Sequence, residues 1–180
     1  MILRLALLTA LLIPIVALPA KDEVTAGTVL AFAQAHGYRD AIDEYFNCAG
    51  GGYDGYARVA SGNPQWRKVA VAFLPHLDGC SSESMRDSLA ESIVHAPAGV
   101  LDLVGNSTAL TVEEVCFPQL WSTDEMDPRA TRKKIRRIRS ALRTVQDPAL
   151  RDRRDACMLY LEEIESRLSQ KTPSGNGNPR

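Results

Sequence analysis

Apolar side chains recur every three or four residues along most of this chain, which is the spacing that places them on one face of an α-helix. The clearest case follows Asn63-Pro64, an N-cap residue and a proline suited to the first helical position. Pro75 limits the helix at its other end. No alternation typical of strands persists anywhere, so the pattern predicts an all-α protein. The apolar stripe of this helix consists of Trp66, Val69, Ala70, Phe73 and Leu74.

Weaker stripes predict further helices on both sides of this one. An Ala-rich segment from Glu23 to His36 meets Gly37, a residue typical of helix ends. Thr111 and Glu114 have the spacing of a capping box, in which each side chain bonds to the backbone amide of the other residue. The other expected elements are a helix at 38–46, a helix that Ser81 or Ser82 caps and that carries Met85, Leu89 and Ile93, and a short apolar segment after Pro97 at 100–104.

The last third of the chain has the pattern of two antiparallel helices. Asp127-Pro128 and Asp147-Pro148 each read as the start of a helix. The predicted fold is a compact irregular helical bundle or short α-solenoid-like stack that ends in this αα-hairpin. The buried stripes would be Ile135, Ile138, Leu142 and Val145 in the first helix, and Leu150, Cys157, Tyr160, Leu161, Ile164 and Leu168 in the second.

The two ends of the chain differ from the rest in composition. Residues 1–20 contain one early cation, Arg4, then an apolar run from Leu5 to Leu18 and Pro19-Ala20, which is the plan of a secretory signal cut after Ala20. An uncleaved N-terminal anchor is the alternative. Residues 171–180 are rich in Pro, Gly, Ser and Asn and are expected to be a disordered tail. Between these two ends we expect a single helical domain at 21–170, which would be exported to the periplasm or outside the cell.

Four cysteines agree with export: Cys48, Cys80, Cys116 and Cys157. None forms the C-x-x-C pair of a zinc ribbon or a thioredoxin-like site, so two structural disulfides are the simplest interpretation in an oxidising compartment. Three connectivities are open. We favour Cys48–Cys80 and Cys116–Cys157, because each bond would then connect neighbouring helices. A catalytic thiol is the alternative, and no local signature supports it.

Several short motifs resemble those of a group of small exported bacterial proteins of unknown function. The resemblance covers most of the chain after the signal and implies export and helical structure, but no activity, cofactor or catalytic residue. The residues that carry it are Trp66-x-x-Val69-Ala70-x-x-Phe73-Leu74, Asp78-x-Cys80, Ser84-x-x-x-Ser88-Leu89, Ala96-Pro97, Val100-Leu101, Val115-Cys116 and Arg154-Asp155-Ala156-Cys157.

Motifs of catalysis are largely absent. The chain has no nucleophile elbow, zinc-protease motif, phosphate-binding loop or dinucleotide fingerprint, and no cofactor is expected. His36, Asp40 and Glu44 would share one helix face and could bind a metal, although Gly37 interrupts that helix. A solvated polar face is the favoured interpretation of these residues, and no metal site is expected. A small envelope hydrolase or metal-dependent enzyme that uses these residues is the alternative function, and a non-catalytic binding protein the favoured one.

Other polar residues have simpler interpretations. His76 and His95 stand at helix ends, where a histidine is more often a boundary residue than a general base. Asp54 lies in a glycine-rich stretch with Tyr53 and Tyr56, and these side chains could line a ligand cleft. A turn is the simpler interpretation of Asp54.

Charge is unevenly distributed. The mature chain would have 20 basic and 22 acidic residues, which argues against a nucleic-acid-binding protein. Residues 21–128 contain 6 basic and 16 acidic residues, a net charge of −10, whereas residues 129–180 contain 14 and 6, a net charge of +8. Ion pairs within the molecule are one explanation. A basic face for an anionic envelope component or an acidic protein is the other.

A hairpin folded about Asp147 would place Arg129 opposite Glu165, Arg132 opposite Glu162 and Arg139 opposite Asp155. That register leaves the hinge without obvious acidic partners, apart from the adjacent Asp147 and Asp152. The sequence therefore predicts an anion or partner patch there, made of Arg143, Arg151, Arg153 and Arg154.

Overall fold

The structure is a computed structural model that describes residues 24–48, 54–106, 110–116 and 127–170. Within these ranges every regular element is helical, as predicted, and no strand occurs. The predicted signal peptide and C-terminal tail lie outside the described residues. The elements are α1 (Ala26–His36), α2 (Tyr38–Tyr45), α3 (Gly55–Ala60), α4 (Pro64–Phe73), the 3-10 turn η1 (Leu74–His76), α5 (Gly79–Ser92), α6 (Pro97–Asn106), α7 (Val112–Cys116), α8 (Pro128–Leu142), the 3-10 turn η2 (Pro148–Leu150) and α9 (Arg151–Gln170).

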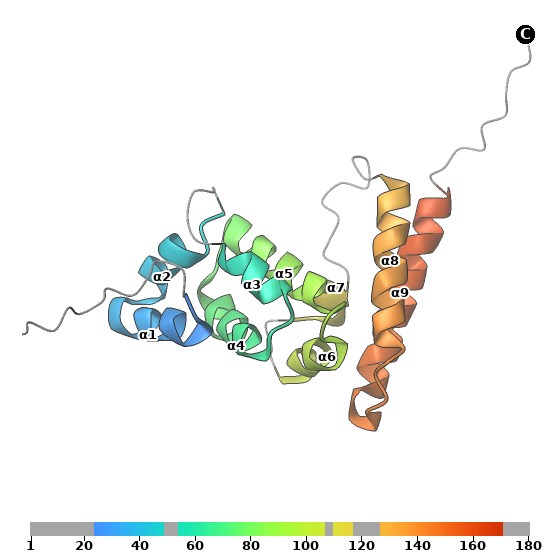
Figure 1. The fold of residues 1–180 in the computed structure, drawn as a ribbon. Helices are drawn as coiled ribbons and strands as arrows, with labels where there is room; N and C mark the ends of the chain where they lie inside the picture. Colours follow the sequence, from blue (N-terminus) through green and yellow to red (C-terminus); the bar gives the residue numbers. More distant parts are fainter. Residues whose placement is uncertain (1–23, 49–53, 107–109, 117–126, 171–180) are drawn as a thin grey trace, which may run out of the picture.

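The helices form an irregular stack that ends in a long hairpin (Figure 1). Helices α1 and α2 lie at one end of the stack, and α3, α4 and α5 form its middle. The antiparallel helices α8 and α9 stand across the other end, next to α6 and α7. None of the described helices is long and apolar enough to cross a membrane.

Side-chain caps explain most of the helix starts. Asn63 accepts a hydrogen bond from the Gln65 amide at 2.8 Å, and Asp127 accepts one from the Arg129 amide at 2.9 Å. Each satisfies an amide that the first helical turn leaves without a partner. The predicted capping box also forms, since the Thr111 amide donates to Glu114 at 2.8 Å and the Glu114 amide to Thr111 at 3.3 Å.

Helix α5 begins earlier than predicted. The amides of Ser81 and Ser82 bond to the carbonyl oxygen of Asp78 at 3.1 and 3.2 Å, so both serines lie in the first turn and neither precedes the helix. The sequence favoured serine because it is a common cap. Because the helix already begins at Gly79, Ser81 and Ser82 are inside it and cannot act as its N-cap.

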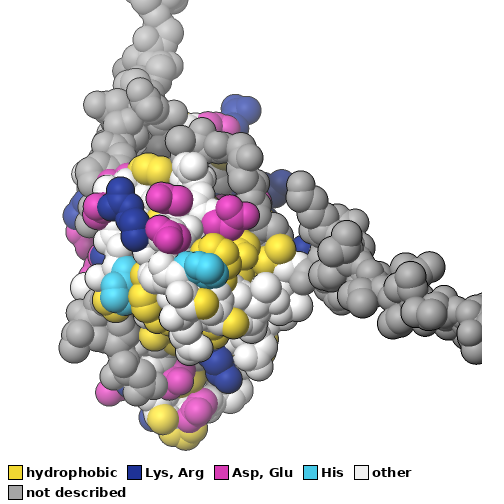
Figure 2. Space-filling view, turned by 90° about the vertical axis from the view of Figure 1, so that its left-hand side faces the viewer, with side chains coloured by type: hydrophobic (Ala, Val, Ile, Leu, Met, Phe, Trp, Pro, Cys, Tyr) yellow, Lys and Arg dark blue, Asp and Glu magenta, His cyan; other side chains and the backbone are white. Residues whose placement is uncertain are grey.

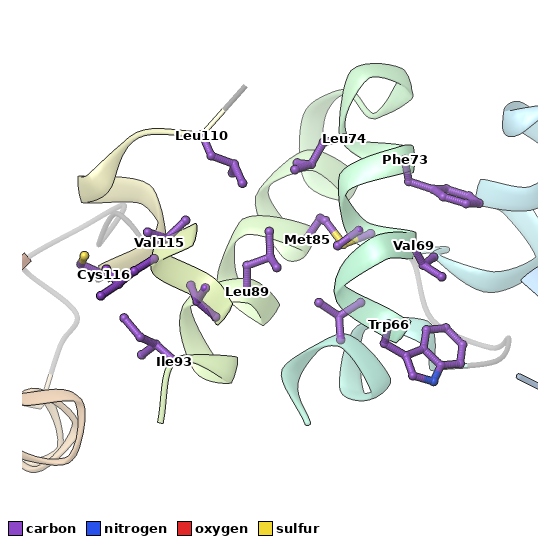
Figure 3. Close-up of a cluster of buried hydrophobic side chains, with 14 of the residues drawn as sticks. Trp66, Val69, Phe73, Leu74, Met85, Leu89, Ile93, Leu110, Val115 and Cys116 are labelled. Carbon is purple, nitrogen blue, oxygen red and sulfur yellow. The ribbon is translucent and has the colours of Figure 1, made fainter. Parts of the chain in front are cut away.

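The core runs between α4 and α5 and continues to α7. Figure 3 shows the buried side chains of α4, α5 and α7 in one row, with Trp66, Val69 and Phe73 at one end, Met85 and Leu89 in the middle and Val115 at the other end. All five residues of the α4 stripe are buried, as predicted. In the hairpin the predicted stripes are buried as well, apart from Tyr160, which is half-buried.

The structure joins the cysteines in the favoured pairs. Cys48 and Cys80 lie 6.2 Å apart between Cα atoms and connect the end of α2 to the start of α5. Cys116 and Cys157 lie 5.6 Å apart and connect α7 to α9. No free cysteine remains among the described residues. The second bond attaches the hairpin to the stack.

Candidate functional site

The predicted metal pattern is divided between two helices. His36 is the last residue of α1, and Gly37 adopts a φ of 94° before α2 begins, so Asp40 and Glu44 do not continue the helix that carries His36. The side chain of His36 packs on Phe32, with ring centroids 4.4 Å apart. No group of three or more histidine, cysteine or acidic residues within the described ranges could hold a metal ion.

The other two histidines lie at helix ends, as predicted. His76 ends η1 and stacks on Tyr38, with ring centroids 3.9 Å apart and an interplanar angle of 15°. Figure 2 looks onto the end of the molecule where α1 and α2 lie, and it shows histidine side chains next to apolar ones, with acidic side chains close by. His95 is exposed just beyond α5.

Asp54 and Tyr56 have structural roles. Asp54 caps α3 by accepting a hydrogen bond from the Ala57 amide at 3.0 Å. The Tyr56 hydroxyl donates to the carbonyl oxygen of Phe46 at 2.5 Å, and burial raises the pKa of this phenol. Tyr53 lies outside the described residues. Asp54 therefore starts α3, and Tyr56 holds α3 against the end of α2.

The four hinge arginines fall into two pairs. Arg153 donates to the carbonyl oxygen of Leu101 at 3.3 Å and lies 3.9 Å from Asp102, which attaches α9 to α6. Arg154 donates to the carbonyl oxygen of Val145 at 3.0 Å and to Asp155 at 2.8 Å, which holds the hinge on α9. Both side chains are partly covered, and their guanidinium groups are engaged within the fold. They are therefore not free in the way that Arg143 and Arg151 are.

Arg143 and Arg151 are exposed and make no ion pair within the described part of the chain. Arg143 caps α8 and, with Arg154, borders a hollow of about 480 Å³ over Met158 and Leu159. Leu159 is 69% exposed, which is unusual for a large hydrophobic side chain among the described residues. The free part of the predicted patch is thus a pair of arginines.

The predicted register of the hairpin ion pairs is wrong. Arg139 lies 3.2 Å from Glu162 and 2.9 Å from Glu165, not next to Asp155. Arg132 donates to the carbonyl oxygen of Leu168 at 3.4 Å. Helical side chains tilt toward the N-terminus of their own helix. In an antiparallel hairpin this tilt moves a long arginine away from the hinge and its glutamate partners toward it, which accounts for the direction of the displacement and for part of its length.

Ion pairs within the described part of the chain account for only some of the hairpin's cations. Lys134 pairs with Glu91 at 3.6 Å, and Arg167 pairs with Glu163. With Arg139, Arg153 and Arg154 this makes five. The seven basic side chains of α8, the hinge and α9 without an ion pair in the described ranges are Arg129, Arg132, Lys133, Arg136, Arg137, Arg143 and Arg151.

A second hollow lies where α8 meets the stack, with a volume of about 580 Å³. We call it the α3–α8 groove. From the sequence, the cations of this groove were predicted only to belong to a basic helix. The sequence does not show which other helices face α8, because that depends on the tertiary structure. The groove is lined by Ala57, Ala60 and Ser61 of α3 and its end, by Glu91, Val94 and His95 of α5 and its end, and by Ala130, Lys133, Lys134 and Arg137 of α8.

No protein-family model, no curated protein and no solved structure matches the chain.

Proposed function

We propose that this is an exported, non-catalytic binding protein that recognises an anionic partner through the basic side chains of the α8–α9 hairpin. The observation that carries the proposal is the set of seven hairpin cations that lack an ion pair within the described ranges. Cations close together on one element repel one another. That repulsion is relieved when an anion binds, so such a surface attracts and holds negative charge.

Export is supported by two independent features. The first 20 residues have the order of a secretory signal, and the four cysteines are joined in disulfides, which persist in oxidising compartments such as the periplasm.

Cleavage of the signal after Ala20 would leave Lys21 as the first residue of the exported protein. N-terminal sequencing of protein recovered from the periplasm or the medium tests this. An exported protein that still begins with Met1 would contradict cleavage and favour the uncleaved anchor.

The hinge pair offers a test of the anionic partner. We expect Arg143→Gln/Arg151→Gln to keep the fold, because both side chains are exposed, and to weaken binding to polyanions about threefold. The salt dependence of binding should also become flatter, since fewer charges then interact with the partner. The measurement is binding to phosphatidylglycerol vesicles, polyphosphate and polyglutamate at two ionic strengths.

The matched control removes two exposed cations outside the hairpin, Arg39→Gln/Lys68→Gln. This control changes the net charge equally but should alter polyanion binding less. A wild-type protein that binds no polyanion at either ionic strength, nor any salt-sensitive component of its native envelope in affinity capture, would overturn the proposed function.

A further inference from the structure

Resting on the proposed function, we propose that the α3–α8 groove is a binding site for an acidic segment of a partner protein. The acidic segment would be held by the side of α8 that faces α3 and the end of α5.

The shape of the groove fits a protruding segment. Its volume of about 580 Å³ lies in the range of sites that bury a ligand. Four of its lining residues have small or apolar side chains that the backbone of a bound segment can approach closely: Ala57, Ala60, Val94 and Ala130. A lipid surface is broad and does not enter a recess between two elements. It would instead meet the outward-facing cations of α8.

The cations of the groove have the spacing of carboxylates on an extended chain. Lys133 and Arg137 are one turn apart on α8, a rise of about 6 Å. Alternate residues of an extended chain project to one side and lie about 6.6–6.8 Å apart, so two acidic residues separated by one other residue can each reach a cation. Hydrogen bonds between charged groups are among the strongest, and arginine can hold a carboxylate with two of them.

The negative groups already in the groove do not occupy these two cations. Glu91 is held by Lys134 at 3.6 Å. At the end of α3 the carbonyl oxygen of Arg58 accepts from Ser61 Oγ at 2.6 Å, and that of Val59 accepts from the Gly62 amide at 3.2 Å. The carbonyl oxygens at the end of α5 are bonded likewise, since the His95 amide donates to Ser92 at 3.0 Å.

The test compares two double variants of the purified protein. Lys133→Gln/Arg137→Gln removes the free cations of the groove, and Arg129→Gln/Arg136→Gln removes two unpaired cations of the same helix that do not line the groove. The probe is a fluorescent peptide of alternating glutamate and alanine. We expect the groove variant to weaken peptide binding about tenfold, and the matched control by less than about threefold.

A third variant separates shape from charge. Ala130→Leu places a larger side chain in the groove, keeps α8 helical and leaves the net charge unchanged. We expect it to weaken peptide binding but not binding to phosphatidylglycerol vesicles. Thermal unfolding of all variants confirms that each is folded.

The outcomes that overturn the inference differ from those that overturn the proposed function. Equal weakening by the two double variants would mean that only the overall charge of α8 matters. A wild-type protein that binds vesicles but not the peptide would make lipid the partner. Either result removes the groove proposal and leaves an anion-binding hairpin, whereas binding to no polyanion at all removes both.

Discussion

Replacing Gly55 by alanine is expected to destabilise the protein by about 3 kcal/mol, because α3 approaches the end of α2 too closely for a side chain. A Cβ atom at this position would lie 2.5 Å from Cε1 of Phe46 and 2.6 Å from the carbonyl oxygen of Tyr45. The Phe46 ring has no room to move, since it is fully buried and packs against Phe73 and Tyr56. The carbonyl oxygen belongs to the backbone and moves only with α2. Urea-induced unfolding measures the loss.

Gly27→Ala is the matched control for this substitution. The nearest heavy atom to its Cβ would be Thr25 Oγ1, at an ordinary contact distance of 3.7 Å. Alanine in a helix is favoured over glycine by up to about 1 kcal/mol, so this variant should be as stable as the wild type or more so. A Gly55→Ala protein with wild-type stability would show that α3 and Phe46 do not pack as described.

Removing the Cys116–Cys157 bond with a double alanine substitution is expected to lower the free energy of unfolding by about 4–5 kcal/mol. The bond closes a loop with a sequence separation of 41, for which the loss of unfolded-state entropy amounts to about 4 kcal/mol. Both side chains are fully buried, so the substitution also removes packing between α7 and α9. Urea-induced unfolding without reductant measures the change.

The Cys48–Cys80 bond is the natural comparison. Its sequence separation of 32 predicts nearly the same entropic contribution, but both cysteines are exposed. The loss in free energy of unfolding on its removal should therefore be smaller by about 1 kcal/mol.

The pairing itself is tested first, by peptide mapping under non-reducing conditions. A peptide that joins Cys48 to Cys116, or Cys80 to Cys157, or a titratable thiol in the native protein, would contradict the assignment on which both expectations rest.

Much of the fold was predictable because its signals are local. The stripe from Trp66 to Leu74 needs only the period of a helix, and the caps at Asn63 and Asp127 act within three residues. The favoured cysteine pairs are confirmed, but the bonds join α2 to α5 and α7 to α9, which are not consecutive helices. The start of α5 was missed because Asp78, Ser81 and Ser82 all lie near the first turn, and pattern alone does not choose among them.

The sequence by itself determined that the chain is helical, where its hairpin lies, and that positive charge collects on that hairpin. All of these depend on period, capping chemistry and composition along the chain. Only the tertiary structure decided that Arg153 and Arg154 bind backbone carbonyls, that Arg139 reaches Glu165, and that α8 and α3 border a groove. Long side chains reach partners that are brought near by the tilt of the side chains and by the packing of the helices. The order of residues alone reveals neither the tilt nor the packing.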